Sequence, residues 1–150
     1  MLKIRRAQAG DRVALLDLLR ENEMEHAEPI GDYLLAVQEE DVLGCIRLEE
    51  CENVSMIRPV VVGKRHRKKG IGRMLIESLP PSDKPRAVAA RGDAVPFYET
   101  LGFLKISWGQ LPTPQQEECD FCPDRSACQP QPMMQGFPKT CEETKKENKR

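Results

Sequence analysis

Apolar and polar residues alternate in short segments along residues 1–110, and their spacing changes between the period of a strand and that of a helix. Leu2 and Ile4 alternate with basic residues, which predicts a short first strand. Gly10 and Asp11 then form a turn, with Asp11 as the expected N-cap of a helix. The apolar positions of this helix are Val13, Leu15, Leu16, Leu18 and Leu19.

Three further strands are expected in the first half of the chain, at residues 33–37, 42–48 and 54–62. The last of them ends in the apolar run PVVV, which leads through a basic loop into a helix. That helix is expected at residues 71–79, with Met74, Leu75 and Leu79 on its inner side, and two prolines end it.

The remaining expected elements are a strand at residues 86–90, a helix at 94–101 and a last strand at 103–108. This order of strands and helices predicts an α/β fold in which helices flank a sheet. Composition changes near residue 110, because six of the twelve prolines and four of the six cysteines follow it. We therefore predict a folded domain at residues 1–110 and a Cys- and Pro-rich tail at 111–150, either packed on the domain or loose.

The charge of the chain is almost balanced, with 23 basic and 24 acidic side chains. A protein that acts mainly as a polycation is excluded, because phosphate binding along a nucleic acid needs an excess of Lys and Arg. No apolar run approaches the roughly 20 residues that span a bilayer, and the N-terminal residues turn polar before a signal peptide could form. We expect a cytoplasmic protein with no membrane partner.

The segment VVVGKRHRKKGIGR carries the most specific chemistry. A buried strand runs into a loop with two spaced glycines, Gly70 and Gly72, which opens a helix. Amides at a helix start have no partner in the helix and favour anions, so this arrangement predicts a pyrophosphate cradle. The segment matches neither the dinucleotide fingerprint nor the P-loop. The alternative interpretation is a solvated basic loop at residues 64–69, or a nucleic-acid patch.

Two motifs in this order resemble the GNAT family of N-acetyltransferases. The first is the apolar strand followed by Arg67-Lys-Lys-Gly70-Ile-Gly72, and the second is FYETLGF at residues 97–103. The resemblance covers residues 1–108. It implies a mixed, mostly antiparallel central sheet, splayed at the cofactor strand and flanked by helices.

The resemblance also implies that acetyl-CoA lies across this sheet. The pantetheine arm would pair with the strand that ends in the apolar run, and the pyrophosphate would bind the glycine loop. The implied cofactor-binding residues are Val60, Val61, Val62, Arg67, Lys68, Lys69, Gly70, Ile71, Gly72 and Arg73. Pro59 supports the pairing of this strand with the pantetheine arm, because proline is tolerated where a strand lies at an edge. The alternative is that Pro59 marks only the start of the strand.

Acetyl transfer needs a proton for the leaving thiolate, and the resemblance assigns this proton to the hydroxyl of Tyr98. The alternative role for Tyr98 is packing of its helix against the sheet, as we expect for Phe97. Backbone amides around residues 60–62 would stabilise the developing oxyanion.

The base that accepts the proton of the amine is less evident. Many members of the family carry a glutamate on the cofactor strand, at a position that falls near Met56 here. Glu49 and Glu52 are the catalytic candidates nearby, beside Glu50, and the alternative is a solvated acidic turn. Arg91 is a candidate for a substrate carboxylate, because a guanidinium binds it in a bidentate way. The two histidines, His26 and His66, are interpreted as surface residues.

The tail holds a C-x-x-C pair followed by two further cysteines. Four thiolates would suit zinc or an iron–sulfur cluster, so a metal site is predicted. Its ligands would be Cys119, Cys122, Cys128 and Cys141. Two alternatives stay open, namely a disulfide or redox use of these thiols, and free thiols in a packed tail.

These observations together predict an enzyme that moves an acetyl group from acetyl-CoA to the amine of a small molecule or amino acid. The alternative is a domain of the same fold that binds acyl-CoA without turnover, which the methionine at position 56 keeps open. A nucleic-acid partner is disfavoured by the balanced charge. The acceptor is not evident from the sequence, and the oligomeric state is open, a homodimer included.

Overall fold

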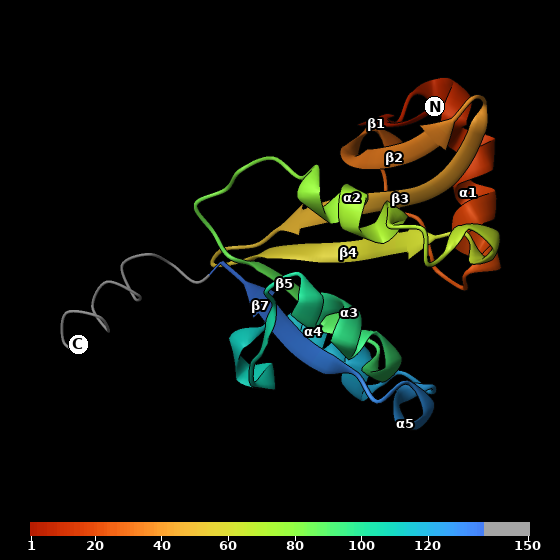
Figure 1. The fold of residues 1–150 in the computed structure, drawn as a ribbon. Helices are drawn as coiled ribbons and strands as arrows, with labels where there is room; N and C mark the ends of the chain where they lie inside the picture. The colour runs from red at the N-terminus through yellow and green to blue at the C-terminus, as the bar shows by residue number, and fades with distance from the viewer. Residues whose placement is uncertain (137–150) are drawn as a thin grey trace. The chain divides into compact units, whose positions relative to one another are not determined.

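The computed structural model describes residues 1–136 of the chain (Figure 1). It divides into two compact units. The first consists of Met1–Glu49 and Ile57–Pro81, and the second of Glu50–Met56 and the described residues from Ser82 onward. Each unit is described by itself below.

A mixed sheet of seven strands runs through the structure in the hydrogen-bonded order β1-β2-β3-β4-β5-β7-β6. The strands are β1 (Leu2–Arg6), β2 (Tyr33–Gln38), β3 (Asp41–Glu50), β4 (Ser55–Val62), β5 (Arg86–Ala90), β6 (Leu104–Lys105) and β7 (Gln131–Gln135). The helices are α1 (Arg12–Glu21), α2 (Ile71–Glu77), α3 (Val95–Thr100), α4 (Thr113–Asp120) and α5 (Arg125–Cys128). Short 3-10 turns span Ala9–Asp11, Ile30–Asp32, Lys64–His66, Gly92–Ala94 and Trp108–Gln110.

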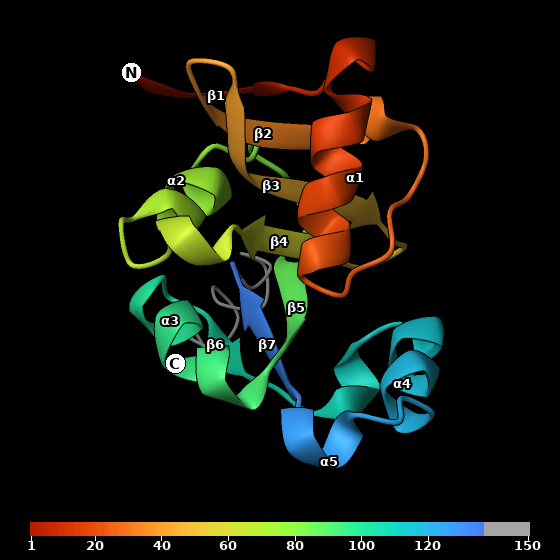
Figure 2. The same cartoon turned by 90° about the vertical axis from the view of Figure 1, so that its right-hand side faces the viewer.

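In the first unit, β1 pairs antiparallel with β2, and β2 pairs antiparallel with β3. Helices α1 and α2 cover opposite faces of these strands, and Figure 2 shows α1 in front of them. Two neighbouring residues of β3 show why. Cys45 points into the cluster that contains the leucines of α1, whereas the Cα of Gly44 faces Leu75 and Ile71 of α2. Alternate residues of a strand point to opposite faces, so each helix has a face of its own.

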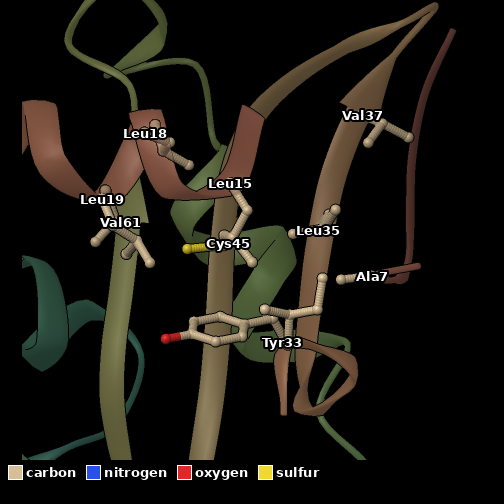
Figure 3. Close-up of a cluster of buried hydrophobic side chains, with 10 residues drawn as sticks. Ala7, Leu15, Leu18, Leu19, Tyr33, Leu35, Val37, Cys45 and Val61 are labelled. Carbon is tan, nitrogen blue, oxygen red and sulfur yellow. The ribbon is translucent and has the colours of Figure 1, made fainter. Parts of the chain in front are cut away.

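The core beneath α1 is apolar and closely packed (Figure 3). Leu15 and Leu19 are almost fully buried against the side chains of β2 and β3. Tyr33 is also fully buried, and its hydroxyl oxygen accepts a hydrogen bond from the Ala27 N–H at 3.0 Å. Burial raises the pKa of the Cys45 thiol to about 12, because the thiolate would lose its hydration.

The start of α1 differs in detail from the sequence prediction. Asp11 stands at the N-cap position, but its side chain makes no capping bond to α1. Its carboxylate instead accepts the Gln8 N–H at 2.8 Å and two bonds from Arg5 at 2.8 and 3.0 Å. These bonds lower the pKa of Asp11, the Arg5 bond most strongly, and they fasten the 3-10 turn before α1 to β1.

In the second unit, the start of β4 pairs with β5 in parallel, through Ser55 with Arg86 and Met56 with Ala87. β7 then pairs antiparallel with β5, and β6 with β7. A small core lies along one face of these strands. Its buried residues are Val54, Met56, Ala87, Leu111 and Met134.

All six predicted strands and the three predicted helices are present in their predicted order. The last predicted strand is shorter than expected and reduces to Leu104–Lys105. Met74 was predicted on the inner side of α2, and this is wrong, because its side chain is exposed while Leu75 and Ile76 are buried. β7 was not predicted, and it brings part of the Pro-rich segment into the sheet.

Within residues 1–136, no helix has the length and apolar character that crossing a bilayer requires.

Candidate functional site

The loop between β4 and α2 has the backbone geometry of an anion cradle. Lys68 and Gly70 both have left-handed backbones, with φ of 65° and 84°. Gly70 stands at the N-cap of α2, and a Cβ built on it would meet no atom within 4 Å. The space above this residue is therefore open to a ligand, and a left-handed backbone at that point suits glycine.

The first turn of α2 presents amide groups to this open space. The Met74 N–H donates to the Gly70 carbonyl at 3.0 Å, which closes the first turn of the helix. The amides of Ile71, Gly72 and Arg73 precede it and so have no intrahelical acceptor. Amides in this position attract phosphate oxygens, and the basic residues before them add positive charge. The donor set and the free space both fit the pyrophosphate of a coenzyme.

Arg67 connects this loop to α1. Its Nε–H donates to the Val62 carbonyl at 3.1 Å, and its Nη2–H donates to Asn22 Oδ1 at 2.7 Å. Asn22 is the C-cap of α1, and its side-chain amide also donates to the Leu18 carbonyl at 2.9 Å. The loop, the end of β4 and the end of α1 are thus joined by side-chain hydrogen bonds.

The strand that leads into the loop is packed closely against β3. A Cβ on Gly44 would lie 2.8 Å from the Val61 carbonyl oxygen and 3.2 Å from Leu75 Cδ1. Val61 is buried, whereas Val60 and Val62 on either side of it are half-buried. Glycine at position 44 therefore allows the backbone of β4 and helix α2 to approach β3.

A cavity of about 360 Å³ lies at the C-terminal end of α1. It is lined by Leu16, Leu19, Arg20, Met24, Glu25 and His26. His26 Nε2 lies 3.1 Å from Glu28 Oε2. His26 was interpreted from the sequence as a surface residue, and its side chain is indeed exposed. No sequence motif marked this cavity, which the end of α1 and the segment directly after it form.

Tyr98, the candidate acid, lies on α3 in the second unit. Its side chain is buried between Phe97 and Phe103, with ring centroids 5.1 and 5.2 Å away in edge-to-face geometry. Burial raises the pKa of the Tyr98 hydroxyl well above its usual value. The phenol therefore keeps its proton at neutral pH.

The candidate carboxylates are in different environments. Glu49 is paired with Arg58 at 3.1 Å. Glu50 is paired with Lys84 at 2.9 Å and accepts a bond from Ser55 Oγ at 2.8 Å; the Lys84 bond most strongly lowers the pKa of Glu50. Glu52 lies on the exposed turn that follows β3.

Met56 and Arg91 also have defined places. Met56, where the family resemblance would put a glutamate, is fully buried in the core of the second unit. Arg91 is exposed at the N-cap of the turn before α3, and its Nε lies 3.6 Å from Asp93 Oδ1.

A family model described as "Acetyltransferase (GNAT) domain" matches residues 29–105, about half of the chain. The match includes β2 to β6, and with them the cradle and Tyr98. The chain belongs to the GNAT acetyltransferase family. The resemblance of its two motifs to this family is thereby confirmed, and the protein is an acetyl-CoA-dependent N-acetyltransferase by family.

One relative of this GNAT protein is an uncharacterised N-acetyltransferase of Chlorobaculum tepidum, which is 28% identical over 130 residues, 84% of this chain and 81% of the relative. The fold is also similar to N-acetylglutamate synthase of Neisseria gonorrhoeae in complex with coenzyme A and N-acetyl-glutamate, with a TM-score of 0.71 and 14% identity. That match covers 90% of this chain, which spans only 35% of the synthase.

A third similar structure is diaminobutyrate acetyltransferase of Paenibacillus lautus, in complex with coenzyme A and L-2,4-diaminobutyric acid. Its TM-score is 0.62 at 14% identity, and the match covers 89% of this chain and 93% of that one. At such low identity these two structures support the fold of the GNAT protein alone.

The cysteines of the tail of this GNAT protein are only partly described. Cys119 lies on α4, Cys122 in the turn after it and Cys128 at the end of α5, and each is a free thiol. Among residues 1–136, no three histidine, cysteine or acidic side chains are grouped as metal ligands. Cys141 lies outside the described residues, so the four-cysteine site stays a prediction.

Proposed function

We propose that this protein transfers an acetyl group from acetyl-CoA to the amine of a small molecule or amino acid, and that the cradle at the start of α2 binds the coenzyme. The observation that carries the proposal is the geometry at Gly70. This residue has a left-handed backbone at the start of α2, and a Cβ built on it would meet no atom within 4 Å. Three amides of the first turn, those of Ile71, Gly72 and Arg73, are then available to pyrophosphate oxygens. Lys68 and Lys69 would add electrostatic attraction.

The pantetheine arm would pair with the backbone of Val60, Val61 and Val62. Two observations support this role. The ladder between β4 and β5 consists of the pairs at Ser55 and Met56, so it ends before Val60 is reached. Arg67 also bonds to the Val62 carbonyl, which places the end of this run beside the cradle. These residues, with the loop from Arg67 to Arg73, form the proposed coenzyme site.

The bound thioester supplies an activated acetyl group, and the chain supplies the proton and the donors. We assign the proton for the departing sulfur to the hydroxyl of Tyr98, which its burial keeps protonated. Backbone amides along Val60 to Val62 would donate to the acetyl oxygen as negative charge develops on it. Phe97 and Phe103 hold the tyrosine ring in place.

An amino acid is the acceptor class that we favour. Two proteins of similar fold were solved with N-acetyl-glutamate and with L-2,4-diaminobutyric acid. The Arg91 guanidinium, which is exposed beside Asp93, would then bind the carboxylate of the acceptor.

The described cysteines are all free thiols, which supports a reducing compartment such as the cytoplasm.

The test is release of free coenzyme A thiol from acetyl-CoA by the purified full chain. The acceptors are the common amino acids, L-2,4-diaminobutyrate and simple alkyl amines, and calorimetry measures acetyl-CoA binding in parallel. Binding together with amine-dependent thiol release supports the proposal. Binding without release for every amine would instead favour the alternative of an acyl-CoA-binding module, and no binding would exclude both.

A further inference from the structure

The cavity at the end of α1 contains a histidine in a defined orientation. His26 lines it beside Arg20 and Glu25, and its side chain is 39% exposed. Apolar walls from Leu16 and Leu19 complete the cavity. A volume of about 360 Å³ is suited to a small molecule.

The backbone on both sides of His26 is held by hydrogen bonds to the rest of the first unit. The Met24 N–H donates to the Leu19 carbonyl of α1 at 2.8 Å. The Ala27 N–H donates at 3.0 Å to the hydroxyl of Tyr33, which is itself fully buried in the core. His26 is therefore carried by a short segment with an anchor on each side.

The imidazole is oriented by a carboxylate. His26 Nε2 lies 3.1 Å from Glu28 Oε2, and Arg12 binds both oxygens of the same carboxylate. The Arg12 bond is the largest influence on Glu28 and lowers the pKa of its carboxylate, so Glu28 stays ionised and only accepts hydrogen bonds. Nε2 must then carry the ring proton, and Nδ1 keeps a lone pair that can accept another.

The chain segment that carries this cavity is connected to the coenzyme loop through Asn22. Asn22, two residues before Met24, accepts the 2.7 Å bond from Arg67. Arg67 in turn bonds to the carbonyl of Val62, in the run that the coenzyme arm is proposed to join. Asn22, which lies in the chain between the cavity residues Arg20 and Met24, is therefore joined to the proposed coenzyme strand through two hydrogen bonds of Arg67.

We propose that His26 is the base that takes the proton from the acceptor amine in this cavity, with Glu28 as its positioning residue. The inference rests on the proposed function and names the base for it. An N–H bond of the ammonium breaks, and the proton passes to Nδ1 of His26. The freed lone pair on nitrogen forms the new C–N bond, the C–S bond of the thioester breaks, and the sulfur takes the proton of Tyr98. The second proton that the nitrogen loses as the amide forms returns through water to the Tyr98 oxygen, so the phenol is restored. The exposed imidazole then returns its proton to water.

The surrounding charges suit an ammonium group. Glu25 is the carboxylate among the residues that line the cavity, and it would face the ammonium group. Arg12 and Arg20 are the cationic groups nearby, and each is paired with a carboxylate, Arg12 with Glu28 and Arg20 with Asp17.

His26 is better placed for this role than the two carboxylates named from the sequence. Glu49 is paired with Arg58 at 3.1 Å, and a neighbouring guanidinium disfavours proton uptake by a carboxylate. Glu52 belongs to the second unit, whereas His26 and the proposed coenzyme loop belong to the first.

The test compares His26→Ala, Glu28→Gln and Glu52→Gln in the full chain, with the amine that gives the fastest thiol release in the wild type. We expect His26→Ala to lower kcat by about 100-fold with acetyl-CoA affinity unchanged, and added imidazole to restore much of the loss. Glu28→Gln should lower kcat by about tenfold, because the ring loses its orientation. Glu52→Gln should keep wild-type turnover. Glu21→Gln, at the same end of α1 but outside the cavity, is the matched control.

Nitrogen NMR of the wild type gives a readout that needs no acceptor. We expect neutral His26 to carry its proton on Nε2, and Glu28→Gln to weaken that preference. Full turnover in His26→Ala, a loss that imidazole does not restore, or a proton on Nδ1 would overturn the proposal while leaving acetyl transfer intact. Wild-type protein that releases thiol with no amine would overturn the proposed function together with it.

Discussion

Asn22 and Arg67 are 45 positions apart in the chain, and their side chains meet in a 2.7 Å hydrogen bond. Arg67 belongs to the loop that precedes the cradle, and Asn22 caps α1 beside the cavity that contains His26. The bond therefore joins the two parts of the first unit to which we assign the coenzyme and the acceptor. Its contribution to catalysis can be separated from its contribution to stability.

Asn22→Ala removes the acceptor for Arg67 and the donor to the Leu18 carbonyl. We expect kcat/KM for the amine to fall severalfold and the free energy of unfolding to fall by about 1 kcal/mol. Asn22→Asp keeps an oxygen for Arg67 but not the amide donor, so its kinetics should stay closer to wild type. Steady-state kinetics and urea unfolding distinguish the two losses. Equal kinetic defects in both variants would show that the Arg67 bond has no kinetic role.

Gly44→Ala tests the close approach of β4 and α2 to β3. The new Cβ would lie 2.8 Å from the Val61 carbonyl oxygen, a backbone atom that cannot move alone. We expect a loss of about 1–3 kcal/mol in urea unfolding. Gly31→Ala is the matched control, because its Cβ would meet no atom within 4 Å, and its stability should change by less than about 0.5 kcal/mol. Similar losses in both variants would argue against a packing cause.

Tyr98→Phe tests the proposed acid. The phenylalanine ring keeps the edge-to-face contacts with Phe97 and Phe103, so unfolding free energy and acetyl-CoA affinity should change little. Turnover should fall by about 100-fold, because the departing sulfur loses its proton donor. Thiol release and calorimetry on the same preparation measure the two effects. An unchanged kcat would remove Tyr98 from the mechanism.

The buried thiol of Cys45 predicts a loss of stability in alkaline solution. The folded protein holds this proton up to a pKa of about 12, whereas the unfolded chain releases it near the ordinary value of 9.0. The unfolded state therefore binds fewer protons above pH 9, and stability falls with rising pH toward 12, by at most about 1.4 kcal/mol per pH unit from this group. Below pH 9 the full contribution is present.

Urea unfolding at pH 8 and pH 10 measures this loss, with Cys45→Ala as the comparison. The variant is less stable at both pH values because it leaves a cavity in the core of the first unit. Its stability should nevertheless fall less between the two pH values than that of the wild type. Parallel decreases in the two proteins would show that another group causes the alkaline loss.

The parts of the structure that the sequence predicted are those in which the signal is local. The cradle follows from a strand, two spaced glycines and a helix within one continuous segment, and the order of six strands follows from their hydrophobic period. Asp11 was placed correctly at the start of α1, but its bonds depend on Arg5, which a capping pattern does not include.

The parts that were not predicted depend on contacts between distant segments. β7 contains Pro132, and a proline argues against an interior strand, yet Pro132 is fully buried opposite Ala89. Its carbonyl accepts the Ile106 N–H at 3.0 Å, so the neighbouring strands decide its conformation. The orientation of His26 likewise depends on Glu28, Arg12 and Tyr33, which share no motif.

The binding of acetyl-CoA to the turn at Gly70 is the most direct test of the whole account, measured by calorimetric titration of the wild type, Gly70→Asn and Gly70→Glu. Asparagine tolerates a left-handed backbone, so Gly70→Asn controls for strain without adding charge. We expect the wild type to bind, Gly70→Asn to bind more weakly because its side chain enters the ligand space, and Gly70→Glu to remain folded but show no binding, because its carboxylate would also repel the phosphates. Equal binding by all three proteins, or no binding by the wild type, would contradict the assignment of this turn.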